Sequence, residues 1–366
     1  MRLFFILLFS FVISSNLKAA IGLPDAIAPE LAASGRALAM GDAFIAKVDD
    51  SMASFYNPAG LGSVRRTHFH LTNFHLEFNS GWSSLGLGGK VTDVVENFVD
   101  AFSIDGMRKL LKDNPGKFAH ERVSFVPNFT TRFISIGYFF NKQTRAYLGE
   151  ASTDLFEFAD RTDQGPFVAF NYSLFGGVFK IGFTGMYLMR KELVNQVNRN
   201  TEIDLEADDY NSGWLNYVIA GAKFTLPIAW LPTLAVTAHN ALDEPFRGVK
   251  AGKTLAPIKR NIVAGASISP KLGRSTVLHL EINYKDVGGE FEDVESSRKI
   301  AAGLEIEWFR MLYWRLGYGD GFGSAGIGLR AKRFEFDLTT YAVDRAASGF
   351  RGEEDRRYAL TVSSGF

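Results

Sequence analysis

The sequence predicts an all-β protein, a transmembrane antiparallel β-barrel of about 14 strands with an N-terminal segment folded inside its lumen. Three observations predict this class. From residue 67 onward, apolar residues alternate with polar or small ones, which is the period of a β-strand. Opposite charges become neighbours on the polar side of that alternation, and aromatic residues lie near the strand ends. The connections between strands alternate between short and long.

The alternation is clearest in the C-terminal third of the chain. Residues 324–332 set apolar positions against small or charged ones: Ala325, Ile327, Leu329 and Ala331 against Gly326, Gly328, Arg330 and Lys332. Successive side chains of a strand point to opposite faces, so each strand has one apolar face and one polar face. A soluble β-sandwich would show the same alternation, and the other two observations favour the barrel.

Charges and aromatic residues occupy the places that a membrane barrel gives them. Arg330 and Lys332 precede a hairpin turn, and Glu335 and Asp337 follow it, so opposite charges face each other on the polar side. A charge-paired lumen beside an apolar exterior is the barrel pattern. The aromatic residues near strand ends fit a girdle at the membrane interface. They are Tyr138, Phe139, Phe140, Trp230, Trp308, Phe309, Tyr313 and Trp314.

The connection lengths give the orientation. We predict strands at 67–78, 125–140, 144–157, 166–175, 178–190, 214–225, 233–241, 259–269, 275–286, 298–309, 312–319, 324–332, 334–343 and 356–366. The short connections are 141–143, 176–177, 226–232, 270–274, 310–311 and 333. The longer ones are 79–124, 158–165, 191–213, 242–258, 287–297, 320–323 and 344–355. Outer-membrane barrels have short periplasmic turns and longer external loops, so both termini are predicted in the periplasm.

Composition excludes several function classes. The 366 residues include 40 basic and 40 acidic side chains, so charge gives no case for a nucleic-acid partner. There are no cysteines, hence no disulfide framework. No nucleophile motif and no Ser-His-acid set is visible, so we predict that the protein is not an enzyme. We predict no metal site and no cofactor.

Residues 1–20 are typical of a secretory signal peptide. Arg2 supplies the positive charge, and residues 3–13 form an apolar run that precedes the small residues Ala19 and Ala20. A retained membrane anchor is the alternative, and it would need about 20 apolar residues. The apolar run is shorter than that, so we predict cleavage and export to the bacterial outer membrane.

The segment 21–64 does not alternate, and it is rich in small residues. Its motif comprises Gly35, Arg36, Gly41, Asp49, Asp50 and, after the aromatic Tyr56, the run Asn57, Pro58, Ala59, Gly60 and Leu61. This motif resembles the N-terminal hatch of the FadL-type long-chain fatty-acid transporter family. It is at least as similar to the related PorV/PorQ-type barrels. The resemblance covers about 30 residues, and its expected hatch residues are Gly35, Arg36, Gly41, Asp49, Asp50, Asn57, Pro58 and Ala59.

The resemblance implies a 14-stranded barrel that is plugged by its own N-terminus. In the FadL-type case it also implies uptake of hydrophobic compounds through a lateral opening. The residues agree in part, because Asn57 can bond neighbouring backbone and Pro58 fixes a turn. An irregular segment at membrane depth is tolerated only where protein or water surrounds it. An ordinary Asn-Pro turn ahead of the first strand is the alternative.

The predicted loop 79–124 is the longest, and we expect it to be partly helical. Apolar residues recur there at helical spacing: Val94, Val95, Phe98 and Phe102, then Met107, Leu110 and Leu111. One interpretation is a pair of amphipathic helices that form an external cap with a groove for an apolar ligand. The other is a lid that packs on the barrel rim and buries the same face without a ligand.

The predicted domains are a signal peptide (1–20), a hatch (21–64) and a barrel (65–366). The leading functional hypothesis is passive uptake of hydrophobic small molecules, such as long-chain fatty acids. Its partners would be outer-membrane lipid, lipopolysaccharide and the apolar ligand itself. The alternative is a PorV-like barrel without transport that acts in protein secretion or envelope organisation, with a secretion-system protein as its partner.

Overall fold

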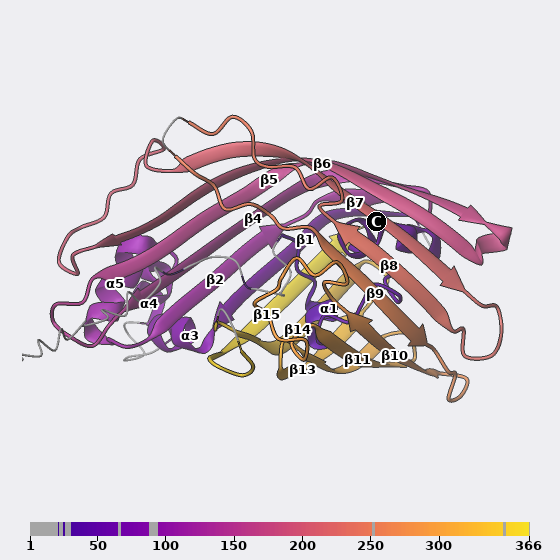
Figure 1. Ribbon diagram of the computed structural model, residues 1–366. Coiled ribbons are helices and arrows are strands. Elements are labelled where there is room, and N and C mark those ends of the chain that lie inside the picture. Colours follow the sequence, from indigo (N-terminus) through magenta and orange to yellow (C-terminus); the bar gives the residue numbers. More distant parts are fainter. Residues whose placement is uncertain are drawn as a thin grey trace, which may run out of the picture.

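The computed structural model describes residues 21, 25, 31–64, 67–87, 94–250, 253–346 and 349–365. Its strands form one antiparallel sheet, and β15 closes that sheet on β1 (Figure 1). Strands β2 and β3 both lie between β1 and β4, so they share one position and the closed barrel has 14. The predicted antiparallel barrel is confirmed.

The strand bounds show where the predictions hold. They are β1 (His68–Asn79), β2 (Phe118–Phe125), β3 (Asn128–Thr130), β4 (Ile134–Leu148), β5 (Phe156–Leu174), β6 (Phe179–Val197), β7 (Asn211–Thr225), β8 (Thr233–His239), β9 (Asn261–Ile268), β10 (Thr276–Tyr284), β11 (Ile300–Trp308), β12 (Leu312–Gly319), β13 (Phe322–Arg330), β14 (Phe334–Asp344) and β15 (Glu354–Gly365). From β6 onward each predicted strand overlaps an observed one. The C-terminal Phe366 lies outside the described residues.

The predictions near the first hairpins are wrong in detail. The predicted turn 141–143 lies inside β4, and the predicted loop 158–165 lies inside β5. Residues 118–124, predicted as loop, belong to β2. These stretches are polar, and polarity there does not end a strand, because the long strands continue beyond the apolar band with polar residues on both faces.

Apart from 141–143 and 158–165, which lie inside strands, the predicted connections are found where expected, with one further exception. The short ones are 131–133, 175–178, 226–232, 269–275, 309–311 and 331–333, and they lie at the end of the barrel where β15 finishes. The predicted longer connection 320–323 is wrong, because only Asp320 and Gly321 join β12 to β13. Both have positive φ, 48° and 87°, as a tight two-residue hairpin turn requires.

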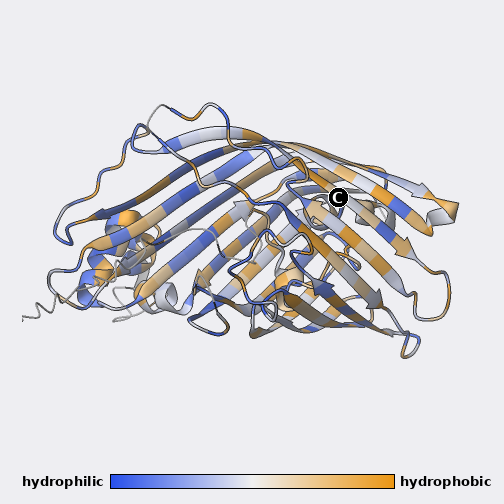
Figure 2. Ribbon diagram, viewed as in Figure 1, coloured by the Kyte–Doolittle hydropathy of each residue, from blue (hydrophilic) through white to orange (hydrophobic). Residues whose placement is uncertain are grey.

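The two faces of the wall differ as a membrane barrel requires. Large apolar side chains on the outward face are exposed, among them Ile136, Phe170, Phe183, Leu234, Ile282, Trp314, Leu316 and Leu338. Charged side chains on the inward face are buried, among them Asp163, Arg190, Glu281, Glu305 and Arg315. The apolar and polar bands along the strands are visible in Figure 2. Lipid contact with the outward face explains why so much apolar surface is left uncovered by protein.

Residues 31–64 lie inside the barrel and are almost entirely buried. They form α1 (Gly35–Ala39), α2 (Ala53–Tyr56) and the 3₁₀ helix η1 (Pro58–Ser63). Helix α1 packs on β12 to β15, and η1 packs on β5 to β7 on another part of the wall. We call residues 31–64 the lumen segment. The predicted signal peptide, residues 1–20, lies outside the described residues.

The connection from β1 to β2 contains three helices, α3 (Ser80–Gly86), α4 (Val94–Asp100) and α5 (Ile104–Asp113). Helix α5 begins at the N-cap Ser103, whose side chain accepts a hydrogen bond from the Gly106 amide. Within the described residues, no helix is both long enough and apolar enough to cross a membrane.

Candidate functional site in the barrel lumen

Arg36 ties the lumen segment to the barrel wall. Its Nε and Nη2 donate to the two carboxylate oxygens of Glu305 at 2.7 Å each, in bidentate geometry. Its Nη1 donates to Asp49 at 2.7 Å and to Asp50 at 3.0 Å. Arg315 donates to the same Glu305 at 2.8 Å and also to Asp337. We call these residues the charge cluster: Arg36, Asp49, Asp50, Glu305, Arg315 and Asp337.

The pKa values of the two neighbouring aspartates of the charge cluster are shifted in opposite directions. Burial raises the pKa of Asp49, but Lys47 and Arg36 outweigh it and hold that pKa well below its usual range. Burial raises the pKa of Asp50, and there the nearby Arg36 does not compensate. Asp49 is therefore the carboxylate that stabilises the buried guanidinium, and Asp50 is the one that is costly to keep ionised.

Further hydrogen bonds hold the lumen segment on the same side of the barrel. Glu281 of β10 accepts the backbone amides of Ala46 and Lys47, each at 2.8 Å. Ser324 of β13 donates to the Ala39 carbonyl at 3.0 Å, and Thr339 of β14 donates to the Gly35 carbonyl at 2.8 Å. The wall thus satisfies backbone groups that an irregular segment leaves unpaired.

Two facing glycines explain how closely this segment meets the wall. Gly41 has a φ of +65°, and a Cβ added there would lie 2.2 Å from the Tyr318 carbonyl oxygen of β12. A Cβ on Gly317 would lie 2.1 Å from the Gly41 amide nitrogen. Only glycine meets both demands, the backbone conformation and the close approach.

Asn57 and Pro58 contact another part of the wall, the strands β6 and β7. The Asn57 side chain donates to the Ile45 carbonyl at 3.1 Å and to the Ala222 carbonyl at 3.4 Å, and it accepts the Ala59 amide at 3.1 Å. A Cβ on Gly182 of β6 would lie 2.3 Å from the Pro58 carbonyl carbon. The Asn-Pro-Ala run therefore joins two parts of the lumen segment to the wall.

The inward face of β4 to β7 is apolar where the lumen segment meets it. Phe55 of α2 packs on Phe139 and Phe167, with ring centroids 5.4 Å and 4.8 Å away. We call the inward apolar residues of these strands the apolar strip: Phe139, Phe167, Ala169, Met186, Leu188, Leu215, Tyr217 and Ile219. All are buried, in one cluster with side chains of the lumen segment.

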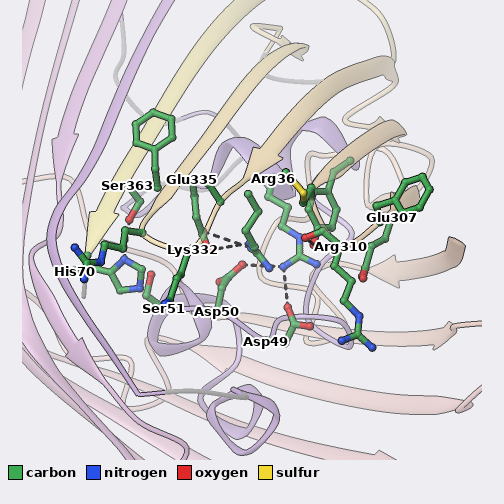
Figure 3. Close-up of a pocket in the computed structure, with 18 residues that line it drawn as sticks. Arg36, Asp49, Asp50, Ser51, His70, Glu307, Arg310, Lys332, Glu335 and Ser363 are labelled. Carbon is green, nitrogen blue, oxygen red and sulfur yellow. Dashed lines mark hydrogen bonds and ion pairs between the residues drawn. The ribbon is translucent and has the colours of Figure 1, made fainter. Parts of the chain in front are cut away.

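A pocket of about 490 Å³ opens between the lumen segment and the short-turn end of the barrel (Figure 3). Arg36, Asp49 and Asp50 form part of its lining, together with Arg310 and Lys332 from two short turns. Figure 3 shows the Arg36 side chain directed toward Asp49 and Asp50. The charge cluster therefore borders the mouth of the lumen at the short-turn end.

The three helices α3 to α5 lie against the outer wall of the barrel and not across its mouth. Phe156 and Phe158 of β5 share the strand face of Phe170 and Tyr172, which are 54% and 64% exposed to the outside. The register between β4 and β5 has no break, so side chains of the same alternation point outward along the whole strand pair, including the part beside the helices. We call the residues buried here the outer-wall cluster: Trp82, Leu85, Ala101, Met107, Leu111, Ala119, Ala146, Leu148, Phe156, Phe158 and Leu193.

The residues predicted to form an apolar groove come together in and around this outer-wall cluster. Met107 and Leu111 are fully buried, whereas Phe102 and Leu110 are partly buried against it. Phe98 is 38% exposed and packs edge-on against Trp82. Val94 and Val95 belong to α4, and their side chains lie outside what the structure describes.

Sequence reasoning identified the lumen segment's motif but missed its partners on the wall. Glu305 and Arg315 stand on the polar faces of predicted strands, and only the packing of the lumen segment against β11 and β12 brings Arg36 to them. The predicted pairing of Arg330 with Glu335 is confirmed at 2.8 Å. Lys332 instead lies in the turn, and Asp337 contacts Arg315. The sequence does contain a signal for the apolar strip that the prediction missed: apolar residues occupy both faces of β4 to β7.

No protein-family model matches the chain, and no curated protein matches it by sequence. Among solved structures, it is similar to the deltaS2S3 mutant of the monoaromatic hydrocarbon channel TodX. That match has a TM-score of 0.50 at 9% identity and covers 92% of this chain and 98% of that one. The monoaromatic hydrocarbon channel CymD gives a TM-score of 0.46 at 7% identity, covering 90% and 96%. The P. putida toluene transporter TodX gives 0.37 at 10% identity, covering 94% and 98%.

The similarity to the TodX mutant shows a shared fold. The predicted resemblance to FadL-type barrels is confirmed at that level, and the resemblance to PorV/PorQ-type barrels stays a prediction. Together with the exposed apolar band, the fold makes this protein an outer-membrane β-barrel, as predicted.

Proposed function

We propose that this protein is a passive channel for hydrophobic small molecules across the outer membrane. The apolar strip is the observation that carries this proposal. The lumen of a water-filled barrel is lined by polar residues, whereas here Phe139, Phe167, Leu188 and Leu215 point inward. An apolar solute could use such a surface once the lumen segment uncovers it.

Uncovering the apolar strip requires the lumen segment to act as a hatch. On the strip side, the segment is held by apolar packing and by four hydrogen bonds to the wall: from Thr184 to the Ser54 carbonyl, from Asn57 to the Ala222 carbonyl, and from Lys180 and Lys223 to the Ser63 hydroxyl. On the opposite side, the charge cluster and Glu281 hold it by directional ionic contacts. We propose that the segment stays anchored at the charge cluster and swings away from the strip.

The outer-wall cluster supplies a place for first capture in this proposal. Phe98, Val99 and Leu87 are 38%, 64% and 51% exposed beside it. Leu87 caps the end of α3, and Phe98 and Val99 belong to α4, so these residues present apolar surface on helices that pack against the outside of the barrel. We propose this apolar surface as the site where a solute first binds; the predicted groove residues Val94 and Val95 have side chains outside what the structure describes. From there it would reach the lumen, and a lateral opening could release it into the bilayer.

Hydrocarbons and fatty acids both belong to the proposed substrate class. The names of the TodX and CymD structures support hydrocarbons, and the sequence motif favours long acyl chains. Apolar burial contributes about 0.8 kcal/mol for each CH₂, or about a fourfold gain in affinity. Affinity should therefore rise with chain length whichever head group the solute carries.

Calorimetric titration of the purified protein with n-alkylbenzenes and with fatty acids of increasing length tests this proposal. We expect affinity to rise at each added CH₂, and Leu215→Gln to weaken binding of both series. Ser324→Ala is the matched control, because it removes one hydrogen bond on the opposite side of the lumen and should leave the affinities unchanged. Heat-modifiable migration on gels would show that each variant is folded. Absent binding, or binding independent of chain length, would contradict the proposal.

The alternative is a PorV-like barrel without transport, with a protein of a secretion system as its partner. Dense packing favours it, because side chains of the lumen segment such as Phe44, Ala53 and Leu61 are fully buried against their surroundings. Such dense packing is expected of a lumen that stays permanently closed. Crosslinking in cells that recovers a secretion protein, together with no apolar ligand binding, would favour this alternative.

A further inference from the structure

Four of the six short turns at one end of the described barrel carry charged residues, and all of these residues are basic. They contain six basic residues and no Asp or Glu: Arg132, Lys271, Arg274, Arg310, Lys332 and Arg333. The connections at the other end differ because each contains at least one acidic residue: 149–155 holds two and no basic residue, and even the basic connection 240–260 holds two beside its five cations. Connection 198–210 holds five acidic residues and one basic one. One end of this neutral protein is therefore selectively cationic.

Exposed apolar side chains adjoin the cations in every charged turn. The pairs are Arg132 with Phe133, which is 62% exposed, Lys271 with Leu272, 64% exposed, Arg310 with Phe309 and Met311, 61% and 51% exposed, and Arg333 with Phe334, 40% exposed. In the two uncharged turns, Phe175 and Trp230 are 80% and 62% exposed. Apolar residues therefore ring this end of the barrel at the level of the cations.

This combination matches the edge of a bilayer. The apolar side chains beside Arg132, Lys271, Arg310 and Arg333 can enter the hydrocarbon boundary while the long basic side chains reach toward the phosphate layer. A cation next to an anionic lipid surface contributes about a fivefold gain in affinity. A surface that met only a protein in the aqueous periplasm would not need an exposed Phe, Leu or Met in or next to every charged turn.

We propose that this periplasmic rim binds the head groups of anionic phospholipids in the leaflet that faces the periplasm. The rim comprises the cations of the six short turns and their apolar neighbours. Arg310, Lys332 and Arg333 also border the periplasmic pocket, so bound lipid would concentrate around the mouth next to Arg36. This inference rests on the turns alone and does not depend on which solute the barrel transports.

Native mass spectrometry after reconstitution into vesicles of phosphatidylethanolamine, phosphatidylglycerol and cardiolipin tests the proposal. We expect the wild-type protein to retain the two anionic lipids in preference to phosphatidylethanolamine. The triple variant Arg310→Gln/Lys332→Gln/Arg333→Gln should retain them at least about tenfold less, given the gain per cation. The control triple variant Arg199→Gln/Lys250→Gln/Lys253→Gln removes three external cations and should behave as wild type.

Two outcomes would overturn the proposal. One is equal retention of anionic and zwitterionic lipids by the wild-type protein, and the other is equal loss in the rim and control variants. A poly-glutamate peptide provides a further arm. Peptide binding that depends on the rim cations, without any preference for anionic lipid, would assign the rim to an acidic protein partner and reject the lipid.

Discussion

The two sides of the lumen hold the same segment by different physics. On the side of β10 to β15, Arg36, Glu305 and Glu281 form directional contacts that specify one position. On the side of β4 to β7, the contacts are mainly the apolar packing of Phe55 and its neighbours on the strip. Charge-assisted hydrogen bonds require particular distances and angles between their partners, whereas apolar packing is non-directional and can be replaced by another apolar molecule. A solute could therefore replace the segment's apolar contacts with β4 to β7 more readily than its ionic contacts with β10 to β15.

The largest expected effect comes from breaking the charged side. Arg36→Met leaves Glu305, Asp49 and Asp50 without their shared cation, and removing one partner of a buried pair costs about 3–5 kcal/mol. Urea-induced unfolding in lipid vesicles should show this loss, and hydrogen exchange should rise throughout the lumen segment. Arg345→Met is the control, because its partner Glu353 has a side chain that is 61% exposed. A surface pair contributes about 0–1 kcal/mol, so equal losses in the two variants would contradict the role of the charge cluster.

Breaking the apolar side should come next in size. Leu215→Ala removes a fully buried side chain of the strip, and such a change costs about 2–5 kcal/mol, depending on how far the site collapses. Hydrogen exchange should rise in α2 and η1 while α1 keeps its protection. Leu316→Ala, on an outward face that is 60% exposed to lipid, is the control and should leave the lumen segment unchanged. Increased exchange in α1 alone would show that the two sides are not independent.

Substitution of the glycine that contacts β12 on the charged side should cause a smaller loss of stability. Gly41→Ala forces a side chain into a left-handed conformation, at about 1–2 kcal/mol, and sets its Cβ against the Tyr318 carbonyl. Gly185→Ala is the matched control, because an added Cβ there meets nothing within 4 Å. Unfolding in urea measures both variants. Equal stabilities would mean that the segment does not approach β12 as closely as described.

The smallest effect is the pH dependence of the two neighbouring aspartates. The folded pKa of Asp49 is depressed, so its stabilisation is present above its ordinary range near 4 and is lost as the pH falls below it. The pKa of Asp50 is raised, so the folded state gains stability as the pH falls toward that range.

These opposite directions can be separated by substitution. At neutral pH, Asp49→Asn should increase hydrogen exchange of α1, whereas Asp50→Asn should leave it unchanged or lower it. When exchange rates measured at different pH values are compared, they are corrected for the intrinsic effect of pH on amide exchange. The reverse order of the two variants would contradict the assignment of the stabilising carboxylate to Asp49.

The sequence was sufficient for the fold because alternation and connection length are local properties. It failed at 141–143 and 158–165, where polar residues continue a strand beyond the apolar band and give no local sign of doing so. It identified Arg36 and Asn57 by motif, yet their partners Glu305 and Ala222 are 269 and 165 residues away in the chain. Only the folding of the lumen segment inside the barrel brings such residues together.

The position of the external helices also could not be predicted. The spacing of Phe98, Phe102 and Met107 predicted an apolar helix face, and that face exists. Periodicity does not say which surface the face covers. The helices cover an outward apolar surface on the long strands β4 to β6, which includes Phe156 and Phe158. The predicted strands were too short to show this surface.

Two engineered disulfides test the central claim, that the segment is anchored on its charged side and moves on its apolar side. The chain has no cysteine, so each pair would be unique. Gly62→Cys/Ser173→Cys pins η1 to β5, since a Cβ on Gly62 lies 2.7 Å from the Ser173 hydroxyl oxygen. Gly35→Cys/Thr361→Cys pins α1 to β15, where a Cβ on Gly35 lies 3.3 Å from the Thr361 Cβ.

The measurement is uptake of a labelled hydrophobic solute by reconstituted vesicles, with each pair oxidised and then reduced. Oxidation of the pair on β5 should abolish uptake, and reduction should restore it. Oxidation of the pair on β15 should leave uptake unchanged. Uptake that survives the β5 disulfide, or that is lost only with the β15 disulfide, would contradict the account.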